Sequence, residues 1–171
     1  MKIGVVSDSH DHKILLRAAL ADAIERGAEA ILHCGDIIAP STLERLGHPQ
    51  VDIHVIHGNN VGDAVGMARV VADPANRICY HGQDADIDLA GRRVFVVHYP
   101  HYARAMAATG DYDLVCCGHT HNSGIDMQPN LQGGKTPVLN PGTVAGIGAT
   151  PSYAMVDLTS LTCEIVPVPV P

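Results

Sequence analysis

Side chains that could bind metal ions fall into five short motifs spread along the chain. The motifs are Asp8-x-His10, Gly35-Asp36, Gly58-Asn59-Asn60, the single His98, and Gly118-His119-x-His121. They supply two carboxylates, a side-chain amide and four imidazoles, a set without thiolates that suits Mn, Fe, Zn, Ni or Co better than Ca. Seven donors exceed the needs of one tetrahedral ion, so the set indicates two ions with positions open for water and substrate.

Each motif taken alone also has an ordinary structural explanation. An isolated Asp8 is most often a turn residue or a helix cap, Asp36 after a glycine is a common turn pair, and His98 could be a core histidine. The Gly-His-x-His pattern is harder to explain in this way, because two imidazoles one residue apart in an extended loop lie on the same side. The conjunction of the motifs is what indicates a metal centre.

The elements that must position these motifs alternate between strands and helices in the first half of the chain. Apolar patterns predict strands at 2–6, 28–34 and 51–57, and helices at 13–26, at 40–47 and near 63–71. Asp8, Asp36 and Asn59 each follow one of the strands. Because ligands bind at the carboxyl ends of strands in open α/β sheets, we expect these residues to meet.

The second half of the chain has a different pattern, with strands joined by glycine-containing turns. Strands are predicted at 78–82, 86–91, 92–99, 114–118 and 136–142, with a helix at 101–110 and a terminal hairpin from 152–158 and 163–168. The turns favour hairpins that join the first three of these strands in succession. The alternate prolines of 165–171 restrict the end of the chain to a sheet edge or a free tail.

Length and composition narrow the class of protein. A length of 171 residues predicts one domain over 1–171, and a net charge of −7 without a basic run argues against a stable nucleic-acid partner. Five cysteines without C-x-x-C, and apolar runs too short for a signal peptide or a membrane span, favour a cytoplasmic protein without a membrane partner. A homo-oligomer is compatible with the sequence. An aromatic content of 4% predicts an open, unselective pocket.

The motifs and their order, together with N-P-G-T at 140–143, resemble the calcineurin-like metallophosphoesterases. The resemblance runs from Asp8 to Gly142 and is closest to the small bacterial and archaeal phosphodiesterase branch, which includes the retromer subunit of this fold. It implies an α/β fold, an αββα sandwich of two mostly mixed β-sheets flanked by helices. It also implies a phosphodiesterase in which a hydroxide held between two divalent ions attacks a small phosphoester substrate.

The same resemblance implies a role for each donor. A first ion would be held by Asp8, His10 and His121, a second by Asn59, His98 and His119, and Asp36 would bridge them. Manganese is the preferred metal, and Ni, Zn, Fe or Co are compatible with the donors.

The chain departs from the family pattern after the third strand, where many relatives carry G-N-H-[DE] and this chain reads GNNVGD. Asn60 can donate a hydrogen bond to a phosphoryl oxygen, but it cannot release a proton near neutral pH. His101 is therefore the leading substitute for a general acid, although a solvated or capping histidine is the commoner case, and an acidic residue, if needed, is displaced to Asp63. His12, His33, His54 and His57 are expected to be structural.

Other functions remain open from the sequence. The same site could serve a phosphomonoesterase or nucleotidase, and the fold could survive as a non-catalytic binding scaffold. Intact donors at every motif argue against a scaffold, since binding alone has no need of them. A structural zinc site is the weakest alternative, because such sites are closed and favour cysteine.

Overall fold

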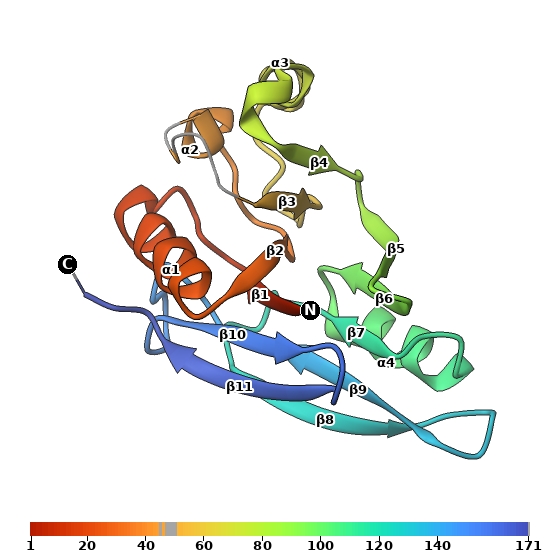
Figure 1. Ribbon diagram of the computed structural model, residues 1–171. Helices are drawn as coiled ribbons and strands as arrows, with labels where there is room; N and C mark the ends of the chain where they lie inside the picture. The colour runs from red at the N-terminus through yellow and green to blue at the C-terminus, as the bar shows by residue number, and fades with distance from the viewer. Residues whose placement is uncertain (45, 47–50, 171) are drawn as a thin grey trace.

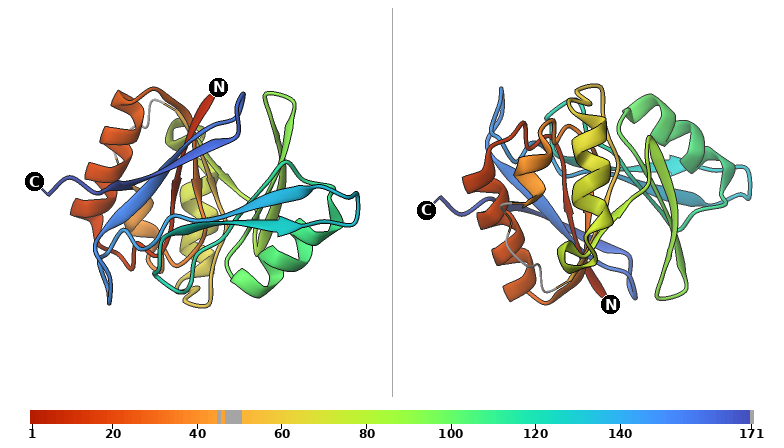
Figure 2. Two further views of the ribbon diagram at one scale, coloured as in Figure 1. Left: turned by 90° about the horizontal axis from the view of Figure 1, so that it is seen from below. Right: turned by 90° about the horizontal axis from the view of Figure 1, so that it is seen from above.

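The computed structural model describes residues 1–44, 46 and 51–170, which form two β-sheets packed face to face with helices on both outer faces (Figures 1 and 2). The first sheet contains, in spatial order, β11 (Thr162–Pro167), β10 (Ser152–Asp157), β1 (Lys2–Val6), β2 (Ala28–His33), β3 (Asp52–Val55) and β4 (Ile78–Tyr80). The second contains β5 (Asp84–Leu89), β6 (Arg92–Val97), β7 (Leu114–Cys116), β9 (Lys135–Asn140) and β8 (Gly124–Pro129). Both sheets mix parallel and antiparallel pairs.

The helices are short, and their ends follow local sequence signals. They are α1 (Lys13–Glu25), α2 (Pro40–Glu44), α3 (Ala64–Ala72), the 3₁₀ turn η1 (Pro74–Asn76) and α4 (Pro100–Thr109). The His12 side chain accepts the Leu15 N–H at the start of α1, and Asp63 caps α3 through the Gly66 N–H. Helix α4 begins at Pro100 and ends at Gly110, whose φ of 81° is the left-handed cap that glycine favours.

Buried apolar side chains form separate clusters on the two faces of each sheet. One cluster, which includes Leu16, Ile31 and Met67, lies between the first sheet and its helices. A second, which includes Leu32 and Leu114, lies between the sheets, and a third packs α4 onto the outer face of the second sheet. The chain therefore has the layer order α, β, β, α, and the predicted sandwich is confirmed.

The register of the parallel strands brings the motif loops to one edge of the molecule. Val6 at the end of β1 pairs with His33 at the end of β2, which pairs with Val55 at the end of β3. In the second sheet β6 and β7 also run parallel, so the segments that follow them leave from the same end. Asp8, Asp36 and Asn59 from one sheet thus meet the histidines that follow β6 and β7.

Two details of the predicted topology are wrong. The segment 78–82 does not form a hairpin with 86–91, because β4 pairs in parallel with β3 at the edge of the first sheet while β5 begins the second sheet. Strand β8 at Gly124–Pro129, which no pattern predicted, pairs with β9 at the far edge of that sheet. The predicted helix at 40–47 is observed as α2 over Pro40–Glu44. Leu46 lies in a turn, and Arg45 and Gly47 lie outside the described residues.

The expectation for the proline-rich end of the chain is confirmed. Strand β11, which ends at Pro167, lies at the edge of the first sheet. Cys116 packs between the sheets and Cys117 packs beneath α4, so the two thiols face opposite sides of the strand. Among the described residues, no helix has the length and apolar character needed to cross a membrane.

Candidate metal centre

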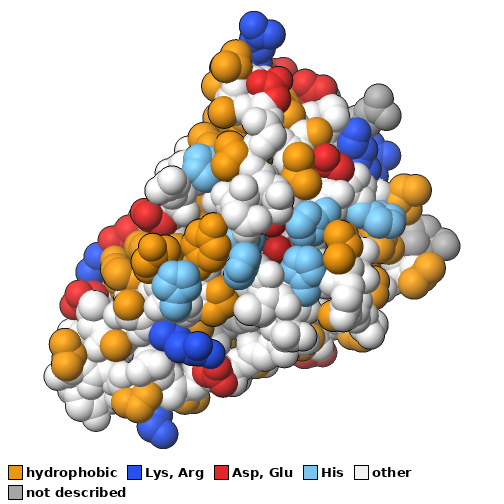
Figure 3. All heavy atoms as spheres, turned by 180° about the vertical axis from the view of Figure 1, so that it is seen from behind, with side chains coloured by type: hydrophobic (Ala, Val, Ile, Leu, Met, Phe, Trp, Pro, Cys, Tyr) orange, Lys and Arg blue, Asp and Glu red, His pale blue; other side chains and the backbone are white. Residues whose placement is uncertain are grey.

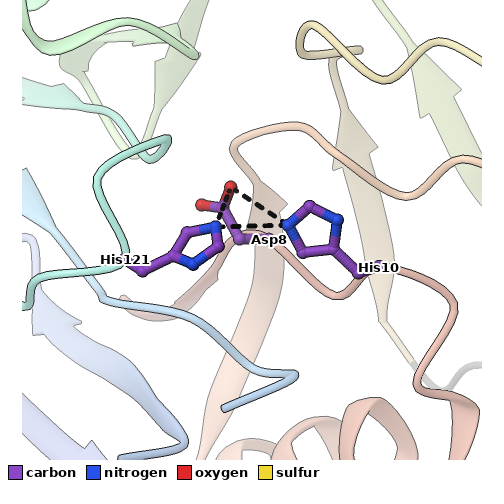
Figure 4. A group of neighbouring side chains, drawn as sticks. All are labelled: Asp8, His10 and His121. Atoms are coloured by element: carbon purple, nitrogen blue, oxygen red, sulfur yellow. Dashed lines mark hydrogen bonds and ion pairs between the residues drawn. The ribbon is translucent and has the colours of Figure 1, made fainter. Parts of the chain in front are cut away.

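Asp8, His10 and His121 form a triangle of donor atoms at the edge where the strands end (Figure 4). Asp8 Oδ1 lies 3.3 Å from His121 Nε2 and 3.8 Å from His10 Nε2, and the two Nε2 atoms are 3.2 Å apart. Ligands about 2.1 Å from a tetrahedral ion are roughly 3.4 Å from one another. The triangle therefore has the dimensions of three ligands around one ion.

His98, Asn59 and His119 make a second group beside the first. Asn59 Oδ1 lies 3.0 Å from His98 Nε2 and 2.9 Å from His119 Nδ1. The rings of His98 and His119 meet edge to face with centroids 5.1 Å apart. The amide oxygen thus lies between two imidazole nitrogens.

Asp36 reaches both groups from the loop after β2. Its Oδ2 lies 3.8 Å from His10 Nε2 and its Oδ1 lies 3.6 Å from His98 Nε2. Asn60 holds this carboxylate with its backbone N–H at 2.9 Å from Oδ1 and its side-chain amide at 2.6 Å from Oδ2. Burial on its own would raise the pKa of Asp36, but the Asn60 hydrogen bonds and the nearby His98 and His10 bring it below its ordinary value. One ligand atom each of Asp8, Asp36 and His98 lie within 4.8 Å of one another, so the two groups of donors adjoin.

The donor atoms present lone pairs to one another, which is the arrangement a cation requires. His121 Nδ1 donates to the Ile147 carbonyl at 2.7 Å and His98 Nδ1 to the Cys34 carbonyl at 2.8 Å, so Nε2 of each neutral ring is an acceptor. Within the described residues, Asp8 Oδ1 is fully buried and has no hydrogen-bond partner. A buried carboxylate oxygen without a donor is costly unless a cation faces it. The residues present fit divalent metal ions.

The loops that carry the donors adopt an unusual backbone. Five of the donor residues have positive φ, namely Asp8 at 52°, His10 at 40°, Asp36 at 61°, His119 at 70° and His121 at 61°. Such values are uncommon outside glycine and cluster at functional sites, where surrounding contacts hold them in place. The turns direct side chains from separate strands toward one point.

Two glycines of the motifs leave room for the donors. A Cβ on Gly58 would meet Asp36 Oδ1 and lie 2.8 Å from the His98 ring. A Cβ on Gly118 would meet Ser7 Oγ and lie 2.6 Å from Asp8 Oδ2. The glycines before Asn59 and His119 are therefore required by close approach to the carboxylates.

Several supporting residues were not predicted as part of the site. Ser7 Oγ donates to Asp8 Oδ2 at 2.6 Å, and Thr143 Oγ1 donates to the Asp8 carbonyl at 2.9 Å. Asn140 Nδ2 donates to the Gly118 carbonyl at 2.8 Å and lies 3.0 Å from Thr120 Oγ1. In the sequence, the N-P-G-T segment indicates only the family. In the structure, Asn140 holds the loop that carries His119, and Thr143 holds the loop that carries Asp8.

His33 is a buried histidine that supports the centre. The Gly35 N–H donates to its Nδ1 at 3.2 Å, so Nε2 carries the hydrogen and donates to Ser9 Oγ at 3.0 Å. Burial, with smaller contributions from nearby charges, lowers the pKa of His33 from 6.5 to about 3. The ring is neutral at physiological pH and fixes the turn that precedes Asp36.

We expect His33 to make the metal-free fold sensitive to acid. Because its pKa is lower in the folded chain, the unfolded chain alone takes up this proton below pH 6.5, and stability falls as pH falls toward about 3. This residue should lower the free energy of unfolding by about 2 kcal/mol between pH 7.5 and pH 5. Denaturant titrations in chelator at pH 7.5 and 5 measure it, with His33→Gln as the variant that removes the titrating group. Equal pH slopes for the wild type and His33→Gln would contradict it.

His101 and Asp63 lie at the starts of helices rather than among the donors. The exposed His101 ring packs against Tyr99 and Tyr102, with centroids 5.6 and 4.2 Å away. Asp63 is occupied as the cap of α3. Figure 3 shows the face that carries the centre, where histidine side chains form a row with an acidic side chain visible between them.

Comparison with known proteins places the fold and the motifs in one family. Residues 1–161 match the family described as the calcineurin-like phosphoesterase superfamily domain. Phosphodiesterase MJ0936 of Methanocaldococcus jannaschii is 26% identical over 160 residues, which cover 92% of this chain and 93% of that protein.

Solved structures show the same fold. An archaeal phosphodiesterase superposes with a TM-score of 0.86 at 24% identity, covering 98% of this chain and 99% of its own. Vps29 of Entamoeba histolytica, solved in complex with zinc, superposes with a TM-score of 0.66 at 16% identity, covering 99% and 100% of the two chains. The family resemblance expected from the motifs is confirmed.

Proposed function

The chain belongs to the calcineurin-like phosphoesterase superfamily, and from that premise we propose that it hydrolyses small phosphodiesters with the help of two divalent metal ions. The observation that carries the proposal is the buried, unpartnered Oδ1 of Asp8 among the described residues, which faces two imidazole nitrogens at ligand spacing. The similarity to an archaeal protein named as a phosphodiesterase supports diesters as the substrate class.

In this proposal the donors divide between the ions as the family resemblance implies. Asp8, His10 and His121 would hold one ion, and Asn59, His98 and His119 would hold the other. Asp36 lies between the groups and faces both. When bound, the ions supply an activated water and neutralise charge that develops on the phosphoryl group. Manganese is the preferred metal for this nitrogen and oxygen set, and the zinc complex of Vps29 makes zinc the first alternative to test.

Asn60 acts in the proposal as a positioning residue and as a hydrogen-bond donor. Its two hydrogen bonds fix both oxygens of Asp36. A phosphoryl oxygen arriving beside it can accept from the same amide, but the amide cannot protonate a departing alkoxide. His101 is exposed, stands three residues after His98 and contacts Tyr99 through its ring, so it remains the candidate acid.

We expect the hydrolysis rate to depend steeply on the pKa of the leaving group. Negative charge on the departing oxygen must be borne without a proton if position 60 supplies none. A series of aryl methyl phosphodiesters of graded leaving-group pKa measures the slope for the wild type, Asn60→His and His101→Ala. Asn60→His should flatten the slope, and His101→Ala should steepen it if His101 is the acid. A shallow wild-type slope that His101→Ala leaves unchanged would show that another donor exists.

The proposed function is tested by metal analysis followed by turnover assays. Purified protein is analysed for bound metal, then assayed with bis(p-nitrophenyl) phosphate and p-nitrophenyl phosphate after loading with Mn, Ni, Co or Zn. Faster turnover of the diester, abolished by chelator and restored by metal, is the expected result. Preference for the monoester would favour a phosphomonoesterase, and metal binding without turnover of either ester would favour a scaffold.

A further inference from the structure

A cavity of about 450 Å³ lies beside the proposed metal centre and shares two residues with it. His98 and Gly58 line both, so the cavity opens directly onto the second group of donors. Its other walls come from the start of β5, the inner end of β6 and the first two turns of α4. A diester whose phosphorus lies at the centre would have one of its ester arms beside this cavity.

The cavity gathers aromatic side chains in a chain that has few. The whole chain contains five tyrosines and one phenylalanine, and three of these six, Phe95, Tyr99 and Tyr102, line the cavity. The expectation of an unselective pocket rested on the low overall aromatic content, and this concentration contradicts that premise. Flat aromatic walls stack well on planar rings.

The two tyrosines differ in how firmly they are held. The Tyr99 ring meets the rings of His98 and His119 edge to face, with centroids 5.3 and 4.9 Å away, so the centre itself fixes its orientation. Tyr102 follows one helical turn later, is 55% exposed, and touches Tyr99 and His101 through its ring. Tyr102 therefore offers a free aromatic surface at the mouth of the cavity, and Figure 3 shows hydrophobic side chains beside the row of histidines.

The charge of the lining selects against a second phosphate. Among the lining residues, all of which the structure describes, Asp84 is the one carboxylate, and neither lysine nor arginine is present. An anionic arm would be repelled by this carboxylate. Gln83 and Asp84 instead offer an amide and a carboxylate to neutral hydroxyl groups, as an acidic residue does for ribose in dinucleotide sites.

From these observations we propose that the cavity binds one arm of the substrate, and that this arm is an uncharged planar ring on a hydroxyl-bearing sugar, that is, a nucleoside. The inference rests on the proposed phosphodiesterase activity and adds the substrate class. Tyr102 stacks on the base, and Asp84 accepts hydrogen bonds from the sugar hydroxyls. The cavity has room for one nucleoside and excludes a longer nucleic acid strand through its charge.

The test compares three alkyl diesters as competitive inhibitors of methyl p-nitrophenyl phosphate turnover by the manganese-loaded protein. They are thymidine 5′-(methyl phosphate), the same compound without the base, and dimethyl phosphate. Thymidine 5′-(methyl phosphate) should bind about tenfold or more tightly than dimethyl phosphate, with the abasic compound between them. Dissociation constants from titration calorimetry should follow the same order, which gives a readout independent of turnover.

Variants assign the preference to named side chains. In Tyr102→Ala, thymidine 5′-(methyl phosphate) should bind only as much more tightly than dimethyl phosphate as the abasic compound does. Tyr102→Phe should keep the wild-type ratio of the inhibition constants, because the stacking surface remains. Asp84→Lys should improve binding of the 3′-phosphorylated thymidine compound relative to the unphosphorylated one. Ile14→Ala on α1 removes an exposed apolar side chain on another face of the molecule and should keep the wild-type ratio.

The outcomes separate the inference from the function on which it rests. Turnover of methyl p-nitrophenyl phosphate with equal constants for all three inhibitors would overturn the nucleoside cavity and leave the phosphodiesterase standing. A preference that survives Tyr102→Ala would also overturn it, because the ring would then bind elsewhere. Failure to hydrolyse the reporter diester at all would contradict the proposed function and the inference together.

Discussion

Replacing Asp36 with asparagine should lower diester turnover by more than about 100-fold and reduce the content of both metals. Residues that only support a metal ligand typically change affinity or activity by about 10- to 100-fold, and a carboxylate that faces both donor groups should exceed that range. The amide keeps the shape of Asp36 but removes the negative charge that faces His10 and His98. Elemental analysis of the purified variant and its rate with bis(p-nitrophenyl) phosphate measure the two effects.

Asp8→Asn is the matched comparison for this variant. It removes the same charge from the neighbouring carboxylate, whose Oδ1 faces His10 and His121. If Asp36 bridges the ions as proposed, Asp8→Asn should deplete mainly one metal while Asp36→Asn depletes both. Full metal content in Asp36→Asn would remove the bridging role, whatever its rate.

Gly58→Ala should be almost as damaging, although it adds only one methyl group. Its Cβ would meet Asp36 Oδ1 and lie 2.8 Å from His98 Nε2, so either the carboxylate or the imidazole must leave its position. A displacement of about 1 Å at a reacting centre can cost on the order of 100-fold in rate. Kinetics of the metal-loaded variant measure the loss, and circular dichroism checks that the fold persists.

Gly124→Ala serves as the control for this substitution. Gly124 begins β8, and a Cβ built on it has no atom within 4 Å, so the same chemical change should leave the rate within about twofold of wild type. Retention of wild-type rate and metal content by Gly58→Ala would show that the loop after β3 yields more easily than its contacts indicate.

The order of elements could be predicted where strands and helices carry strong patterns, as in the first half of the chain. The error at β4 and β5 arose because Gly82 between two β-like runs favours a hairpin locally, whereas the parallel partner of β4 is the earlier strand β3. Strand β8 escaped prediction because its alternation of apolar and polar residues covers only 125–128, the shortest run that indicates a strand. Its apolar residues Ile125 and Met127 are both exposed, so no core contact distinguishes them.

That the candidate donors lie close together could be predicted, because each stands at a strand end in a recognisable motif. Their supports could not, because Thr143 meets Asp8 across 135 positions of sequence and Ser7 and Thr120 look like ordinary loop residues. The cavity likewise depends on distant segments, since Asp84, Phe95 and Tyr102 become neighbours only when the second sheet forms. Contacts between residues so far apart leave no periodic pattern in the sequence from which they could be predicted.

At the left-handed positions of the donor loops, the residue that would bind metal is not the residue that would best stabilise the fold. Each of Asp8, His10, Asp36, His119 and His121 holds a conformation that costs roughly 1–3 kcal/mol when it is strained, and glycine would adopt it freely. A selection for heat resistance in the absence of metal would therefore favour glycine at the very positions that carry the donors. Thermostabilised descendants of this chain obtained in that way would keep the sandwich and lose the chemistry, so directed evolution of the enzyme must select with metal and substrate present.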